Sequence, residues 1–137
     1  MSLDRLAFIA VLAAMLAACA PMRSTGCASG EQALVHDSLI FGTGKPRGGV
    51  VTSAEWAEFL KSTVTPRFPQ GLTVSPASGQ WRGADGAIVQ EASQLLQLVH
   101  PDDTASERAV QELVAAYKAQ FQQEAVLRVK ARACVSF

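Results

Sequence analysis

The sequence has no net charge, few cysteines and no long apolar run. The lack of net charge and the lack of a long apolar run each exclude a class of protein. Lys plus Arg number 12 and Asp plus Glu number 12. A chain that binds nucleic acid through bulk positive charge should be clearly basic, so that class is excluded. No apolar run reaches the roughly 18 residues that a permanent membrane-spanning helix needs. Hydrophobic residues make up 49% of the 137 residues, which predicts one folded domain with an apolar core.

Motifs for catalysis, metals and cofactors are missing too. The sequence contains no Cys-x-x-Cys pair and no Gly-x-Ser-x-Gly elbow. The loop 42–45 (Gly-Thr-Gly-Lys) lacks the spacing of a phosphate-binding loop, and Pro46 follows its lysine. His36 and His100 have no second ligand at helical spacing. We therefore expect no catalytic residue, no metal and no cofactor.

The N-terminal segment has the pattern of an export signal. Arg5 precedes an uninterrupted apolar run over residues 6–18. This run has the length of a signal-peptide core and is too short to span a bilayer. The sequence therefore predicts a signal peptide over residues 1–18.

The signal ends in Leu16-Ala17-Ala18-Cys19, which resembles the lipobox of bacterial lipoproteins. The resemblance implies that Cys19 carries the lipid, palmitate included, and becomes the new N-terminus. The protein would then contact the membrane through this lipid, and residues 19–32 would serve as a tether. Ala20, rather than Asp, follows the cysteine. By the sorting rule of such lipoproteins, this favours the outer membrane, facing the periplasm, over the inner membrane.

Two cysteines remain once Cys19 is assigned to the lipid. Outside the cytoplasm thiols are usually oxidised, so we expect a disulfide between Cys27 and Cys134. Two free thiols are the alternative. A pair of cysteines alone is too small a set for a zinc site.

The order of the predicted elements indicates the fold class. Strands are expected over 34–41 and 88–100, and over 72–74 and 80–82 with an interruption at 75–79. One helix is expected to begin after Thr52 and to end before Pro66, and another to open at residues 102–104. A last strand is expected over 125–137.

This order, β-α-β-β-α-β, predicts an α+β domain over residues 33–137. It is the ferredoxin-like split βαβ arrangement, an antiparallel sheet with two helices on one face. Right-handed crossovers place the last strand beside the first, at one edge. Cys27 and Cys134 then lie near each other, so the topology and the disulfide support one another.

Capping patterns mark the start of both helices. Thr52 with Glu55 forms a capping box, and Val51 with Trp56 suits a hydrophobic staple. The same spacing predicts a second box at Thr104 and Glu107.

The last strand alternates apolar and polar residues. We expect the apolar row, which includes Leu127 and Val129, to face the core. The basic row, Arg128, Lys130 and Arg132, is then expected to be a solvated face that discourages aggregation of the sheet edge.

Four residues form the candidate site, namely Arg67, Trp81, Arg82 and Glu91. Arg82 and Glu91 are expected to lie across a hairpin, with Trp81 beside them. An Arg–Glu pair with a flanking Trp suits a small polar ligand. The alternative is a structural clasp that holds the hairpin.

A longer motif carries a family resemblance. It consists of residues 64–74 (Val-Thr-Pro-Arg-Phe-Pro-Gln-Gly-Leu-Thr-Val), 79–82 (Gly-Gln-Trp-Arg) and Glu91, and it also takes in Phe41-Gly42 and Glu55-Trp56. It resembles an uncharacterised family of small bacterial lipoproteins, a domain of unknown function, from about Leu39 to the C-terminus. The resemblance implies an anchored, extracytoplasmic domain and brings no activity with it.

We therefore expect a non-enzymatic, lipid-anchored module that binds an envelope protein or a small polar ligand, or that has a structural role in the envelope. The alternative is a small enzyme of the oxygenase or isomerase type. Such an enzyme would pair as a homodimer through its open sheet faces and enclose a cavity. This alternative rests on fold analogy only.

Overall fold

The structure is a computed structural model and describes residues 26–83 and 85–137. The predicted signal peptide 1–18, Cys19 and Ala20 lie outside the described residues. The elements are β1 (Gln32–Gly42), α2 (Ser53–Phe59), the π-helical turn η2 (Leu60–Val64), β2 (Thr73–Arg82), β3 (Ile88–His100), α3 (Thr104–Phe121) and β4 (Leu127–Val135). In these ranges no helix is both long enough and apolar enough to cross a membrane.

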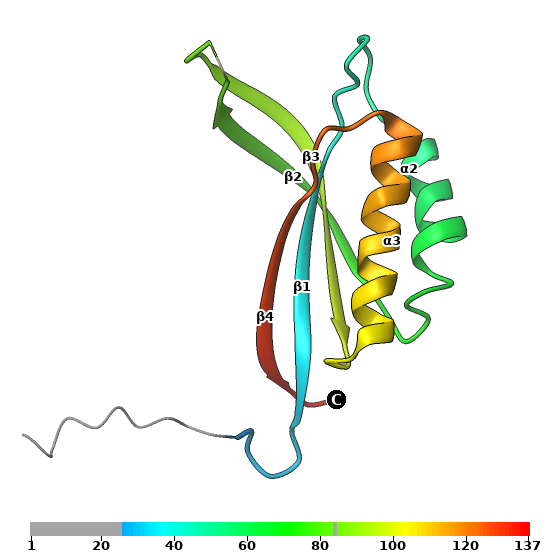
Figure 1. Cartoon of the computed structure of the whole chain (residues 1–137), viewed down its shortest axis with the longest axis vertical. Coiled ribbons are helices and arrows are strands. Elements are labelled where there is room, and N and C mark those ends of the chain that lie inside the picture. Colours follow the sequence, from blue (N-terminus) through cyan, green and yellow to red (C-terminus); the bar gives the residue numbers. More distant parts are fainter. Residues whose placement is uncertain (1–25, 84) are drawn as a thin grey trace, which may run out of the picture.

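The four strands form one antiparallel sheet in the order β2-β3-β1-β4. Both helices cover the same face of this sheet, and the opposite face is open (Figure 1). The fold is therefore the predicted ferredoxin-like α+β arrangement, with β4 beside β1 at one edge.

The start of α2 follows the predicted capping pattern. The Thr52 side chain accepts a hydrogen bond from the Glu55 backbone N–H, and the Glu55 carboxylate accepts one from the Thr52 N–H. Val51 and Trp56 are both buried in the core, as a hydrophobic staple requires. The helical segment ends in η2, whose C-cap Thr65 directly precedes Pro66, as predicted. Thr65 itself keeps helical backbone angles and donates its N–H to the Leu60 carbonyl, so the proline does not push it out of the helical region.

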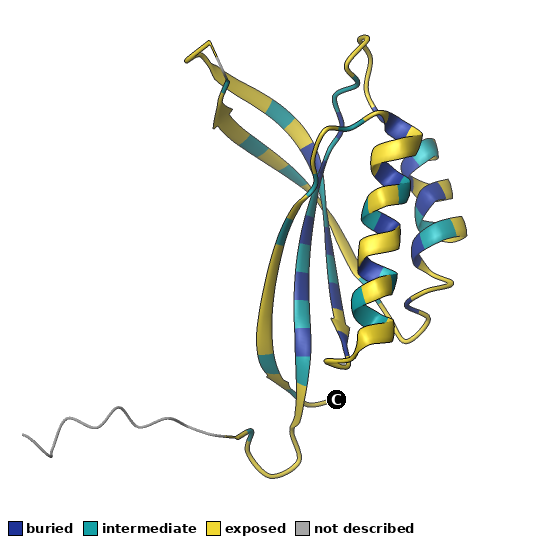
Figure 2. Cartoon of the chain, viewed as in Figure 1, coloured by how far each residue is buried: buried dark blue, intermediate teal, exposed yellow. Residues whose placement is uncertain are grey.

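The core lies between the helices and the sheet face that they cover. Aromatic rings dominate it, with centroid separations such as 4.6 Å between Phe41 and Tyr117 and 5.2 Å between Phe59 and Tyr117. Their tilted and edge-on packing is the favourable arrangement for aromatic pairs. In Figure 2 the buried positions alternate along β1, whereas β4 is exposed or half-buried throughout.

Helix α3 begins differently from the prediction. Its N-cap is Asp103, whose carboxylate accepts a hydrogen bond from the Ser106 N–H at 2.7 Å. The expected capping box of Thr104 and Glu107 is therefore wrong by one position. Asp103 competes successfully because Asp is as good an N-cap as Ser or Thr, and Glu107 is left free for ion pairs.

Strand β2 is continuous, so the interruption expected at residues 75–79 is wrong. Its pairing with β3 runs without a break from Thr73↔Gln97 to Arg82↔Ile88. Pro76 is tolerated because β2 is an edge strand, where a missing backbone N–H costs no ladder hydrogen bond.

The orientation of β4 is the largest departure from the prediction. Its apolar row faces the open side of the sheet, where Leu127 is 59% exposed and Val129 is 54% exposed. The basic row faces the helices, and Arg128 is only 21% exposed. The expected buried face is therefore wrong, and so is the expectation that all of the basic row is solvated. The reason is an ion-pair network beneath α3.

Candidate functional site

A cleft of about 650 Å³ opens at one end of the uncovered sheet face. Strand β1 contributes Ile40, β3 contributes Glu91 and Ser93, and β2 contributes Trp81. The segment between α3 and β4 lines the remaining side. The β2–β3 hairpin bends away from the helices at this end (Figure 1).

The Glu91 carboxylate lies against two glycines in this cleft. Its Oε1 accepts a hydrogen bond from the Gly44 N–H at 2.7 Å. A Cβ atom at Gly42 would lie 2.7 Å from the same oxygen, and one at Gly44 would lie 2.9 Å from it. Any side chain at either position would therefore displace the carboxylate.

Three hydrogen bonds from side chains fix the backbone around Glu91. Thr43 Oγ1 donates to the Ala92 carbonyl at 2.7 Å, and Tyr117 Oη donates to the Gly42 carbonyl at 2.9 Å. Gln123 Nε2 donates to the Gly44 carbonyl at 2.6 Å. Burial, together with the charges of Glu91 and Glu55, raises the pKa of Tyr117 to about 12. The phenol therefore remains a neutral donor at physiological pH.

The four residues of the predicted site are not brought together. Trp81 and Glu91 share the open face, but Arg82 lies on the opposite face in the register of β2 with β3. Arg67 pairs with Glu112 at 3.4 Å, on the helix side. The structure forms no Arg82–Glu91 ion pair, so it supports neither the clasp nor a ligand site that depends on that pair.

A second polar cluster joins β1, β3, α3 and β4 beneath the helices, and its centre is Asp37. The Asp37 side chain is fully buried and receives two hydrogen bonds from Arg128, at 2.8 and 2.7 Å. Arg128 also makes two hydrogen bonds to Glu107, at 2.6 and 2.9 Å. His100 Nε2 lies 2.9 Å from Asp37 Oδ2. Every polar group of this cluster is engaged with another, which is typical of a structural network.

The charges in this cluster stabilise one another. Burial alone would raise the pKa of Asp37, but hydrogen bonds from Arg128 and His100 outweigh it and hold that pKa below its usual value. Hydrogen bonds from Arg128 and Lys130 lower the pKa of Glu107. Conversely, Glu107 and Asp37 raise the pKa of Arg128. All three groups are therefore charged at physiological pH.

The remaining candidates have simple placements. His36 lies half-buried on the open face, and His100 is buried at the end of β3. Lys45 pairs with Glu55 at 2.8 Å and holds the pKa of that carboxyl to about 2. The glycine-rich loop that contains Lys45 therefore supports the start of α2.

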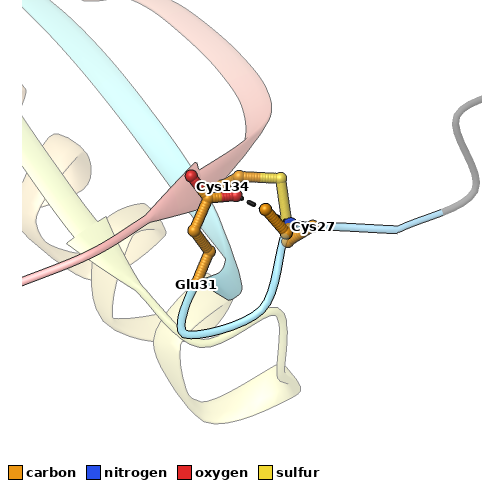
Figure 3. Close-up of a disulfide and its surroundings, with 4 residues drawn as sticks. Cys27, Glu31 and Cys134 are labelled. Carbon is orange, nitrogen blue, oxygen red and sulfur yellow. Dashed lines mark hydrogen bonds between the residues drawn. A yellow bond between two sulfur atoms is a disulfide. The ribbon is translucent and has the colours of Figure 1, made fainter.

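Cys27 and Cys134 are joined by a disulfide, with their Cα atoms 5.4 Å apart (Figure 3). It forms where the topology requires it, because Cys134 pairs with Ala33 at the start of β1. The Glu31 carboxylate lies nearby and accepts a hydrogen bond from the Ala28 N–H. Since both sulfurs are committed to the disulfide, these three residues offer no thiolate to a metal ion.

Sequence reasoning missed three contacts at these sites. The first is the contact of the Glu91 carboxylate with Gly42 and Gly44. The other two, Asp37–His100 and Asp37–Arg128, likewise join residues far apart in the sequence. The motif that included Glu91 was the only sequence signal for the cleft.

Solved structures with the same fold come from proteins of low sequence similarity. A phage SAM lyase, in complex with S-methyl-5'-thioadenosine, superposes with a TM-score of 0.55 at 15% identity, covering 83% of this chain and 95% of the lyase. CutA from Synechococcus elongatus PCC7942 gives a TM-score of 0.52 at 14% identity, covering 76% of this chain and 80% of CutA. At these identities the likeness establishes the fold alone.

Comparison with curated proteins finds no match. Residues 36–137 match a family described as "Protein of unknown function (DUF3574)". The match covers both helices, β2, β3, β4 and most of β1, and so includes Glu91 with its glycines and the Asp37 network. The chain therefore belongs to the DUF3574 family.

Proposed function

We propose that this protein is a lipid-anchored lipoprotein of the bacterial cell envelope. In this proposal its domain is a non-enzymatic module that binds a small polar ligand in the open-face cleft. The observation that carries the binding function is the cleft itself, because a fixed carboxylate lies inside a concave and largely apolar site. Ligand sites typically combine such walls with a few well-placed polar groups.

The anchor is supported by sequence and by cysteine usage. Leu16-Ala17-Ala18-Cys19 supplies the lipobox-like end of the signal. The disulfide between the other two cysteines suits an oxidising compartment such as the periplasm. Ala20 favours the outer membrane. In this compartment the domain would meet envelope proteins and small solutes but no nucleic acid.

Intact mass spectrometry tests the anchor. The protein purified from membranes is expected to lack residues 1–18 and to carry fatty acid on Cys19. The Cys19→Ser chain is expected to carry none and to leave the membrane fraction, because no acyl chain then holds it. A full-length, unmodified mass for the native sequence would overturn the anchor.

Native mass spectrometry of the same preparation tests the binding function. We expect a small molecule to remain bound, and we expect Gly42→Ala to release it. The new methyl group would lie 2.7 Å from Glu91 Oε1 and push the flexible carboxylate aside. Gly26→Ala is the control, because Gly26 lies outside the cleft and its new methyl group would meet nothing within 4 Å. Equal retention by both variants would contradict a site built around Glu91.

The open sheet face supports the alternative, a homodimeric enzyme. Its strands carry one formally charged side chain, Glu91, and an exposed apolar row on β4. From strand spacing, four strands of about ten residues offer about 600 Å² of sheet plane. This approaches the ~800 Å² that each partner contributes to a standard interface. A dimer mass, with turnover of the retained molecule, would favour this alternative, whereas a monomer would exclude it.

A further inference from the structure

We infer that the open-face cleft selects an organic cation, an ammonium or guanidinium group on a small apolar body. The inference rests on the proposed binding function and adds the chemical class of the ligand. It follows from the charge of Glu91, the hydrogen-bonding groups beside it and the aromatic ring at the rim.

The cleft presents a negative charge that the protein leaves unbalanced. Within residues 26–83 and 85–137, no Lys, Arg or His side chain forms an ion pair with Glu91. Lys45 also lines the cleft, but its Nζ is bound to Glu55 at 2.8 Å. A half-buried carboxylate with no counter-ion favours a positive group brought by a ligand.

Hydrogen-bonding capacity remains for that positive group. A carboxylate has about four acceptor positions, and Glu91 uses one of them, on Oε1, for the Gly44 N–H. Ser93 lies beside it in the cleft, and this residue is only 5% exposed. No buried side-chain N or O atom of the described residues lacks a partner, so the Ser93 hydroxyl, for which no hydrogen bond is formed, reaches solvent in the cleft. It can therefore accept a hydrogen bond from a ligand N–H.

The walls suit an apolar or aromatic body behind the cation. Trp81 lies two pairs along the strands from Glu91, on the same face, and 46% of it is exposed. An indole face attracts cations and stacks on planar groups. Ile40 and Leu127 add apolar surface on the opposite side of the cleft.

Calorimetry with three probes of one shape tests the inference. Phenethylamine, 2-phenylethanol and phenylacetate share a phenyl ring but carry a positive, a neutral and a negative group. The full chain, purified from membranes in a neutral detergent, is expected to bind phenethylamine at least about 10-fold more tightly than 2-phenylethanol. A factor of ten corresponds to about 1.4 kcal/mol. Phenylacetate is expected not to bind.

Glu91→Gln keeps the shape of the side chain and an acceptor for the Gly44 N–H, and removes the charge. It is expected to abolish the preference for phenethylamine over 2-phenylethanol, because the amide carries no charge to select the ammonium group. Equal affinities in the native chain, or a preference that survives Glu91→Gln, would overturn the cation inference and leave the binding function standing. If none of the three probes binds, the inference fails, and a cargo retained in the native preparation would still support the binding function.

Discussion

Loss of the Cys27–Cys134 disulfide is expected to lower the free energy of unfolding by about 4 kcal/mol. The two cysteines are 107 residues apart in the sequence, so the bond closes a loop that contains almost the whole domain. In the chain-entropy account, closing a loop of this length removes about 4–5 kcal/mol of conformational freedom from the unfolded chain. Urea unfolding of the Cys27→Ser/Cys134→Ser variant, followed by circular dichroism, measures the loss.

A control separates the covalent bond from the side chains. A reductant should destabilise the native protein to the level of the double variant and should leave the double variant unchanged. A loss below about 1 kcal/mol would contradict the prediction. It would mean either that the ends of β1 and β4 stay close to each other in the unfolded chain, or that their pairing in the folded domain does not need the disulfide.

Replacing Arg128 with Met is expected to cost about 3 kcal/mol of unfolding free energy. Asp37 is fully buried, and Arg128 supplies two of its hydrogen bonds and its main countercharge. Removing one partner of a buried pair leaves an uncompensated charge, which is far costlier than losing an exposed pair. Chemical denaturation at pH 7 measures the difference.

Arg132→Met on the same strand is the matched control. Arg132 is 87% exposed and pairs with the half-exposed Asp102, so its loss is expected to cost under about 1 kcal/mol. Adding Asp37→Leu to Arg128→Met should recover stability, because the unpaired charge then disappears. If the double variant is no more stable than Arg128→Met alone, the cost does not come from the buried carboxylate of Asp37.

The topology could be predicted because it depends on local signals. Short segments of consecutive residues suffice to recognise the Thr52–Glu55 capping box, the proline after η2 and the long strand β3. Once their order is known, handedness rules leave few arrangements of the strands. The neighbouring positions of Cys27 and Cys134 follow from that order.

The two faces of β4 could not be assigned in this way. Alternation shows that a strand has two different faces, but it does not show which of them the helices cover. The choice depends on Asp37, which meets Arg128 across 91 residues of sequence. Hydrophobicity alone therefore predicts the wrong face of the sheet for the apolar row of β4. The buried carboxylate of Asp37 pairs with Arg128, and this pair places the basic row on the helix side.

The cleft was only partly predictable for a related reason. Glu91 and Trp81 belong to a recognisable motif, but Arg82 was grouped with them through sequence proximity. Neighbours in a strand point to opposite faces, so Arg82 leaves the site that Trp81 enters. Gly42 and Gly44, rather than Arg82, contact Glu91, and both lie 47 or more residues away from it in the sequence.

The disulfide makes the polypeptide from Cys27 to Cys134 a closed ring. A peptidase that cuts this ring once, for example between β2 and β3, opens it without releasing a fragment. The two halves of a nicked domain would stay joined through the disulfide, and β2 and β3 would keep their pairing. The disulfide therefore also protects the domain against the loss of either half after a single cut.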